Sequence, residues 1–218
     1  MDKRKFAASY SGGKDGALAL YRAIESGHTP LCLLTTYNGE EQRSWFHGIP
    51  AELLTRAAES MGIPLKLIKT GEGDDYAQDF ERALAELKEV GADTCVFGDI
   101  DIREHYDWCD QRCQAVGVQS MFPLWNESRE ELVYELIDRG FRAIITIVDT
   151  SRMSERFLGK TLTRELAKEI AAEGADICGE NGEYHSFVYD GPIFCEPVRF
   201  QLGDAVQSGK YKILPVLA

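Results

Sequence analysis

Basic residues are scarce in this chain. Its 218 residues include 24 lysines and arginines against 36 aspartates and glutamates, which gives a net charge of −12. A protein that holds a long nucleic-acid backbone usually presents an excess of lysine and arginine. The charge balance therefore argues against nucleic acid, transfer RNA included, as a partner.

Membrane segments and paired cysteines are lacking as well. No apolar run approaches the length of a membrane span, and Lys3, Arg4 and Lys5 lie too close to the first motif to leave room for a signal peptide. The six cysteines are scattered, although Cys109 and Cys113 could share a metal ion on one helix. This spacing favours reduced thiols over a disulfide framework or a zinc site. We expect a cytoplasmic protein with no membrane contact.

Short apolar runs alternate with amphipathic stretches up to about residue 148, which is typical of strands covered on both faces and joined by helices. The predicted strands span residues 6–10, 31–36, 65–70, 94–100, 118–122 and 143–148. The predicted helices span residues 17–26, 50–61, 76–90, 103–116 and 129–139. This alternation predicts an α/β fold with a doubly wound parallel sheet, in which ligands bind at the carboxyl ends of the strands.

The pattern changes after residue 148. Residues 149–160 are polar, residues 163–172 read as a short amphipathic helix, and strand-like runs follow at 193–202 and 211–217. We therefore expect a large unit at residues 1–148 and a smaller C-terminal α+β portion at residues 149–218. The smaller portion should close over the carboxyl edge of the sheet.

The most informative motif is the hexamer Ser-Gly-Gly-Lys-Asp-Gly at residues 11–16, between the first predicted strand and the first helix. Its adjacent glycines leave backbone N–H groups open to an anion, and the helix N-terminus adds a positive dipole end. Lys14 supplies a charge for phosphate oxygens, whereas Asp15 suits a phosphate site only if a divalent cation lies between them. A Walker loop is excluded because Asp15 follows the lysine. We predict a site for a metal-bound polyphosphate.

A second group of polar residues occupies residues 179–187, Gly-Glu-Asn-Gly-Glu-Tyr-His-Ser-Phe. Two carboxylates, a carboxamide, an imidazole and a hydroxyl fall within it, and Gly179 and Gly182 let the backbone approach a ligand closely. A hairpin turn at Asn-Gly, with Tyr184 and Phe187 packing against the core, explains the segment equally well. The residues alone leave both interpretations open.

Together the motifs resemble a known family. The hexamer resembles the PP-loop of the ATP pyrophosphatases, which split ATP into AMP and pyrophosphate to adenylate a substrate. With the second motif and Tyr-Asp-Gly-Pro at residues 189–192, the chain resembles the diphthine-ammonia ligases among them, in the short form of archaea and bacteria. The resemblance extends through residues 98–100 and 123–125, over nearly the whole chain.

This resemblance implies a PP-loop or HUP-like fold and a ligase that uses ATP and Mg²⁺ to join ammonia to a carboxylate through an acyl-adenylate. The first unit would bind the nucleotide and the second the acceptor. In the family the acceptor is diphthine, a modified histidine of elongation factor 2, which becomes diphthamide. An organism without diphthamide would amidate another small-molecule or protein carboxylate. Ammonia would arrive free or from a separate donor, and a homodimer is compatible with the sequence.

The resemblance, carried over by position, also implies the site residues. ATP would meet Ser11, Gly12, Gly13, Lys14, Asp15, Gly16, Thr35, Gly98 and Asp99. The acceptor would meet Glu180, Asn181, Glu183, Tyr184 and His185. Catalysis would fall to Lys14, Asp15, Glu183 and His185, and the metal to Asp15 and Asp99. A nucleotide-binding regulatory module without turnover is the alternative from another class of protein.

Several of these residues can also be explained by a structural role alone. Asp99 could cap the following helix, and threonines such as Thr35 are as common at strand ends without function. His47 could reach a phosphate, but we favour a structural role for this histidine slightly over phosphate contact. His185 lies among acidic residues, which should favour its protonated form. Diphthine carries a quaternary ammonium, so we expect an acidic, aromatic acceptor pocket. It would be formed by Glu180, Glu183, Tyr184, Phe187, Tyr189 and Asp190.

Overall fold

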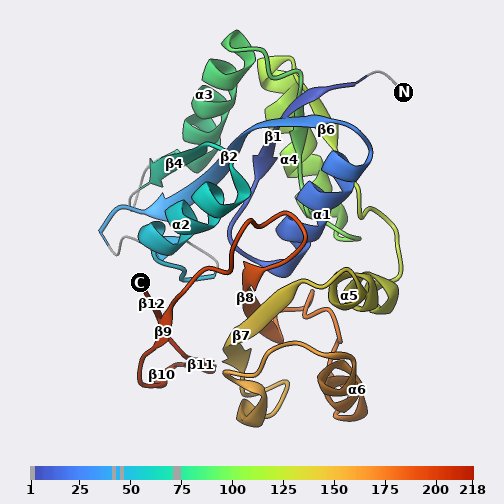
Figure 1. The fold of residues 1–218 in the computed structure, drawn as a ribbon, viewed down its shortest axis with the longest axis vertical. Helices are drawn as coiled ribbons and strands as arrows, with labels where there is room; N and C mark the ends of the chain where they lie inside the picture. The colour runs from blue at the N-terminus through green and yellow to red at the C-terminus, as the bar shows by residue number, and fades with distance from the viewer. Residues whose placement is uncertain (1–2, 41–42, 45–46, 71–74) are drawn as a thin grey trace.

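The first half of the chain forms the parallel sheet that the alternating pattern predicts. The computed structural model describes residues 3–40, 43–44, 47–70 and 75–218. Within these residues the sheet has the order β4-β2-β1-β5-β6, with the short strand β3 antiparallel to the end of β2 (Figure 1). The strands are β1 (Lys5–Ser9), β2 (Thr29–Asn38), β3 (Arg43–Ser44), β4 (Leu65–Thr70), β5 (Thr94–Val96) and β6 (Gln119–Met121).

Helices cover both faces of this sheet, because successive residues of each buried strand point to opposite sides. Phe6 and Ala8 of β1 pack into the core with α1 and α2, whereas Ala7 packs into the core with α3 and α4. The helices are α1 (Lys14–Glu25), α2 (Ala51–Met61), α3 (Tyr76–Glu89) and α4 (Arg103–Val116). The doubly wound parallel fold is therefore confirmed, and its helices lie within a few residues of their predicted bounds.

A second, antiparallel sheet lies below the first in Figure 1. Its order is β10-β11-β7-β8, formed by β7 (Arg142–Asp149), β8 (Tyr184–Asp190), β10 (Val206–Ser208) and β11 (Tyr211–Ile213). The helices α5 (Arg129–Asp138) and α6 (Arg164–Ala172) accompany it, with the single turn η1 (Glu155–Phe157). A separate pair joins β9 (Gln201–Leu202) to β12 (Val216–Leu217).

The membership of β7 corrects one expectation. Residues 143–148 were expected to continue the parallel sheet, but β7 pairs antiparallel with β8 and β11. A boundary at residue 148 therefore cuts through the end of β7 in the second sheet. The strand is buried on both faces, so its run of apolar residues looks the same as that of a central parallel strand.

The segment after β8 also differs from its predicted strand at residues 193–202. Only Gln201–Leu202 pairs as a strand there. The backbone N–H of Cys195 instead donates to the Ser60 carbonyl at the end of α2, and that of Val198 donates to Tyr189. The segment therefore ties the C-terminal portion back to α2.

Among the described residues, no helix combines the length and the apolar character that crossing a bilayer requires.

The two sheets meet where β8 lies against the loop after β1. The N–H of Val188 donates to the Gly12 carbonyl over 2.8 Å. Phe187 is fully buried beside this bond, with its ring perpendicular to that of Phe200 at 5.6 Å between centroids. The second sheet thereby fixes the position of the first motif.

Truncating this contact should cost stability. Phe187→Ala should lower the free energy of unfolding by about 3–5 kcal/mol, because it leaves a cavity between the two sheets. Urea unfolding followed by circular dichroism measures the loss. The matched control, Val90→Ala at a position 68% exposed, should change stability by less than about 0.5 kcal/mol. A Phe187 variant as stable as the unaltered protein would contradict this role.

Candidate active site

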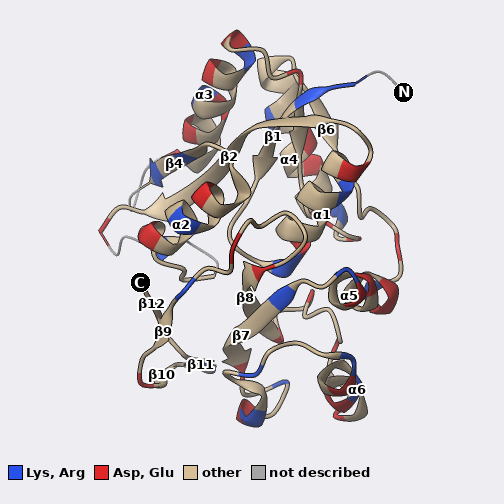
Figure 2. Ribbon diagram, viewed as in Figure 1, with Lys and Arg blue, Asp and Glu red and all other residues tan. Residues whose placement is uncertain are grey.

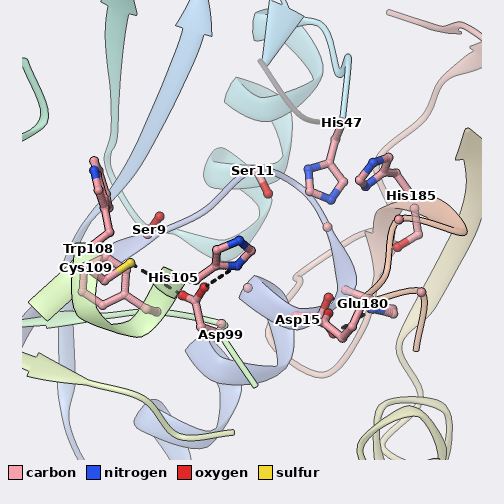
Figure 3. Close-up of a pocket in the computed structure, with 18 of the residues that line it drawn as sticks. Ser9, Ser11, Asp15, His47, Asp99, His105, Trp108, Cys109, Glu180 and His185 are labelled. Atoms are coloured by element: carbon pink, nitrogen blue, oxygen red, sulfur yellow. Dashed lines mark hydrogen bonds and ion pairs between the residues drawn. The ribbon is translucent and has the colours of Figure 1, made fainter. Parts of the chain in front are cut away.

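A cavity of about 620 Å³ opens at the carboxyl ends of β1 and β5. Figure 3 shows side chains from distant segments facing it. Of the residues anticipated from the sequence, it is lined by Ser11, Gly13, Lys14, Asp15, Gly16, Gly98, Asp99, Glu180, Tyr184 and His185. Residues of the two motifs, far apart in the sequence, therefore share one site.

The first motif forms a tight turn followed at once by a helix. Gly12 has a φ of +86°, which side-chain-bearing residues rarely adopt. A Cβ on Gly13 would lie 2.4 Å from Nε2 of His47, so only glycine fits there. Helix α1 begins at Lys14 with no side chain capping its N-terminus. Its first N–H groups are therefore available to an anion.

Gly98 lets the end of β5 approach this turn. A Cβ at that position would lie 2.6 Å from the backbone nitrogen of Gly16 and 2.7 Å from the carbonyl carbon of Asp15. Both are backbone atoms, which cannot move aside without displacing α1. Gly98 thus has a structural reason to be glycine at the cavity wall.

Lys14 is a buried ammonium group surrounded by acidic groups. Its Nζ lies 2.8 and 2.7 Å from the carboxylate oxygens of Asp15 and 5.6 Å from the centre of the Tyr184 ring. Burial disfavours the charge, but Asp15, with Cys178, Tyr184 and Glu180, holds the pKa of Lys14 well above its usual value. The ammonium therefore stays charged, fixed at the start of α1.

Asp15, Cys178 and Glu180 form the strongest candidate for a cation site among the described residues. One ligand atom from each lies within 4.8 Å of the others. Burial, followed by the charge of Asp15, raises the pKa of Glu180 to about 7, so the second negative charge beside Asp15 is costly to form. The two carboxylates suit Mg²⁺, whereas the Cys178 thiol is a softer ligand.

Asp99, the second predicted metal ligand, lies outside that group. Its carboxylate is 3.6 Å from Nδ1 of His105 and accepts a hydrogen bond from the Cys109 thiol at 3.7 Å (Figure 3). Burial raises the pKa of Asp99. The metal assignments of Asp15 and Asp99 stay predictions, and the geometry groups Asp15 with Glu180 and not with Asp99.

His185 corrects the expectation that it is protonated. Burial, followed by the nearby charge of Lys14, lowers its pKa, and Asp15 opposes this only partly. The side chain of Glu183, which was expected to favour the cation, is not among those lining the cavity. His185 is thus a neutral imidazole at the cavity wall near pH 7.

Glu183 and Asn181 hold the second motif together instead of facing the cavity. Glu183 is 5% exposed and accepts hydrogen bonds from the backbone N–H and the amide of Asn181 at 3.1 and 3.2 Å. The turn closes where the N–H of Gly182 donates to the Gly179 carbonyl. Glu180 and Glu183 are three residues apart, yet only Glu180 reaches the site.

Arg129 links this turn to the unit that contains the parallel sheet. Its guanidinium binds both oxygens of Asp101 at 2.6 and 2.7 Å, and Asp176 at 2.5 Å. Asp176 in turn accepts hydrogen bonds from the backbone N–H groups of Cys178 and Glu180. Nothing in the sequence pattern singled out this bridge.

Three further residues that were predicted to contact a ligand lie away from the cavity. Thr35 is buried and its hydroxyl donates to the Tyr10 carbonyl, so its side chain supports the turn and does not line the cavity. Phe187 and Tyr189, expected in the acceptor pocket, do not line it either. Tyr189 instead shares a hydrogen bond with Thr161.

An aromatic wall, which the sequence analysis did not predict, lines the other end of the cavity. Tyr76 and Phe80 lie one turn apart on α3, and Trp108 of α4 packs against both with ring centroids 5.5 and 5.8 Å apart. Phe97, which follows β5, completes the wall. The spacing of Tyr76 and Phe80 signals an apolar helix face, but a core contact satisfies that signal as well as a cavity does.

Comparisons with known proteins bear on this site. The model of the diphthamide synthase N-terminal domain matches residues 4–120, and that of the C-terminal domain matches residues 128–210. The chain belongs to the diphthamide synthase family. The break between the matches precedes β7, in agreement with the place of that strand in the second sheet.

Relatives within the family carry one name. A diphthine–ammonia ligase of Mus musculus is 26% identical over 97% of this chain and 88% of its own length. The diphthine–ammonia ligase of Danio rerio is 26% identical over 94% of this chain and 90% of its own length. Both relatives are therefore covered over most of their length. A solved structure described as a predicted subunit of tRNA methyltransferase from Methanocaldococcus jannaschii covers 85% of the chain and 96% of its own, at 16% identity and a TM-score of 0.47.

The raised pKa of Glu180 has a measurable consequence. In the unfolded chain this carboxyl should ionise near its ordinary pKa of 4.5, whereas in the folded protein it does so near 7. Folding therefore takes up a proton between these values, and the contribution of Glu180 to stability falls as the pH rises through that window. The Glu180→Gln variant has no carboxyl to ionise at this position, so it does not lose stability in this way.

Urea unfolding without nucleotide or divalent cations, at about pH 5 and about pH 8, should show the Glu180→Gln variant gaining stability relative to the unaltered protein at the higher pH. A difference between the two proteins that is the same at both pH values would contradict the placement of Glu180 beside Asp15.

Proposed function

We propose that this protein is an ATP-dependent ligase that amidates the carboxylate of diphthine with ammonia and releases AMP and pyrophosphate. The observation that carries the proposal is the shared cavity, in which the phosphate-binding turn at residues 11–16 faces the second motif across the Asp15–Glu180 pair. Family membership and the names of the relatives supply the reaction class.

ATP fits the cavity with its phosphates on the first motif. The open N-terminus of α1 and the Lys14 ammonium receive the phosphates. The wall of Tyr76, Phe80 and Trp108 offers flat apolar surfaces for the adenine base at the other end. Gly98 and Asp99 lie between the two ends, beside the ribose.

The bound metal would be held by Asp15 and Glu180, whose carboxylates are otherwise only partly compensated. When bound, Mg²⁺ supplies positive charge against the charge that grows on the leaving pyrophosphate. Lys14 and the N–H groups of the turn contribute to the same stabilisation from the protein side.

The reaction proceeds in two displacements. A carboxylate oxygen of the acceptor bonds to the α-phosphorus as the bond to the bridging oxygen breaks, and pyrophosphate leaves. Ammonia then bonds to the acyl carbon, AMP departs with the electrons of the C–O bond, and the nitrogen loses one proton. His185 is neutral and lines the cavity, so it can accept that proton.

The charge of the cavity suits a cationic acceptor. Among the described lining residues, four carry carboxylates, namely Asp15, Asp99, Glu104 and Glu180. Lys14 is the one permanent cation among them. A quaternary ammonium beside the reacting carboxylate, as in diphthine, reduces this imbalance. Elongation factor 2 is accordingly the protein partner, and ammonia arrives free or from a separate donor.

The wider surface is consistent with a protein partner in the cytoplasm. Basic and acidic segments alternate on α3 and α6, with no long basic stripe along either helix (Figure 2). All six cysteines are free, as expected in a reducing compartment.

The reaction itself is the direct test. The protein, ATP, Mg²⁺, ammonium and elongation factor 2 bearing diphthine should yield AMP and pyrophosphate in equal amounts, together with a diphthamide-bearing factor seen by mass spectrometry. Omitting the factor or ammonium should stop amide formation. ADP as the product would contradict the phosphate site, and ATP binding without turnover under any of these conditions would favour a regulatory module.

Lys14→Ala should reduce AMP formation by about 10²- to 10³-fold, because it removes a preorganised charge from the leaving group. Thermal unfolding and circular dichroism check that the variant is folded. Lys168→Ala, exposed on α6, is the matched control and should retain full turnover. Turnover near normal in the Lys14 variant would rule out the assigned phosphate site.

A further inference from the structure

His47 lies over the phosphate-binding turn, although it comes from a segment outside both motifs. The residues that follow it are bonded to β3: the N–H of Gly48 donates to the Ser44 carbonyl at 3.0 Å and that of Ile49 to the Ser44 hydroxyl at 3.1 Å. Arg43 donates to the Gly48 carbonyl at 2.9 Å. The chain directly after His47 is therefore held at the end of β3.

The imidazole reaches the backbone that should bind phosphate. Its Nε2 is the atom that a Cβ on Gly13 would meet at 2.4 Å, so the missing side chain of Gly13 makes room for this ring. The ring also lies against that of His185, with centroids 5.0 Å apart and planes at 70° (Figure 3). Both rings line the cavity.

The hydrogen bonds of His47 are incomplete. Its Nδ1 is buried and has no hydrogen-bond partner among the described residues. A buried polar atom without a partner costs free energy, so a histidine kept only for packing would be expected to have both nitrogens bonded. A ligand that reaches this ring would remove the cost.

The Lys14 ammonium favours an anion as that ligand. Burial, followed by the nearby His185 and Lys14, holds the pKa of His47 well below its usual value, so the ring is neutral near pH 7. Asp15 and Glu180 also line the cavity, where the carboxylates are the groups we assign to the metal ion.

We propose that His47 binds the terminal phosphates of ATP, the part that leaves as pyrophosphate, and so is a nucleotide ligand supplied by the segment between β3 and α2. The proposal rests on the proposed function for the identity of the nucleotide. Nδ1, the ring nitrogen without a partner among the described residues, donates a hydrogen bond to a phosphate oxygen. His185, across the ring contact, steadies the imidazole.

Comparing three anions tests this assignment. Calorimetry should show that His47→Ala weakens the binding of ATP and of pyrophosphate, each with Mg²⁺, by about tenfold or more, because a hydrogen bond to a charged group is lost. Binding of AMP should stay within about twofold, since AMP lacks the phosphates that His47 contacts. His47→Gln retains an N–H donor and should recover part of the loss.

His28→Ala is the matched control, because His28 lies in the turn before β2 and accepts a hydrogen bond from the Arg4 backbone there. It should leave all three affinities unchanged. Equal weakening of ATP, pyrophosphate and AMP in the His47 variants, or no weakening of any, would overturn the proposal. If the unaltered protein binds all three but never amidates an acceptor, the proposed function fails while the role of His47 stands.

Discussion

The buried ammonium of Lys14 is the charge on which the rest of the site depends. It is fixed at the N-terminus of α1 against Asp15, and among the described lining residues it stands alone against four carboxylates. Burial makes each uncompensated charge costly, which is visible in the raised pKa values of Glu180 and Asp99. The carboxylates of the cavity therefore exceed its permanent cations among the described lining residues, an imbalance that a bound cation would reduce.

Two sheets are needed to build this arrangement. The parallel sheet supplies the turn after β1 and the end of β5, while the antiparallel sheet brings Cys178, Glu180 and His185 against them. The Cys178 thiol donates to the Asp15 carboxylate from 163 residues away in the sequence. Neither unit contains the whole cavity lining. The buried contact at Phe187 and the ion pairs of Arg129 therefore hold the two parts of the lining together.

Local signals were enough to predict the parallel sheet and the glycine turn at residues 11–16, since a strand, two glycines and a helix carry their own geometry. They were not enough for β7, whose apolar run fits either kind of sheet. The side chains of Glu180 and Glu183 look equivalent in the sequence, but the turn at Gly182 sends only one of them into the cavity. His47, Trp108 and Arg129 join the site through tertiary contacts that no spacing encodes.

The central claim is that one nucleotide spans the cavity, with its phosphates between Lys14 and His47 and its base against Trp108. The most direct measurement is a crystal structure with Mg²⁺ and an ATP analogue that resists cleavage of the α–β bond. The account predicts phosphate oxygens bonded to the backbone of the turn at residues 11–16, the metal on Asp15 and Glu180, and the adenine packed on the aromatic wall. A nucleotide whose phosphates lie elsewhere in the molecule would contradict it.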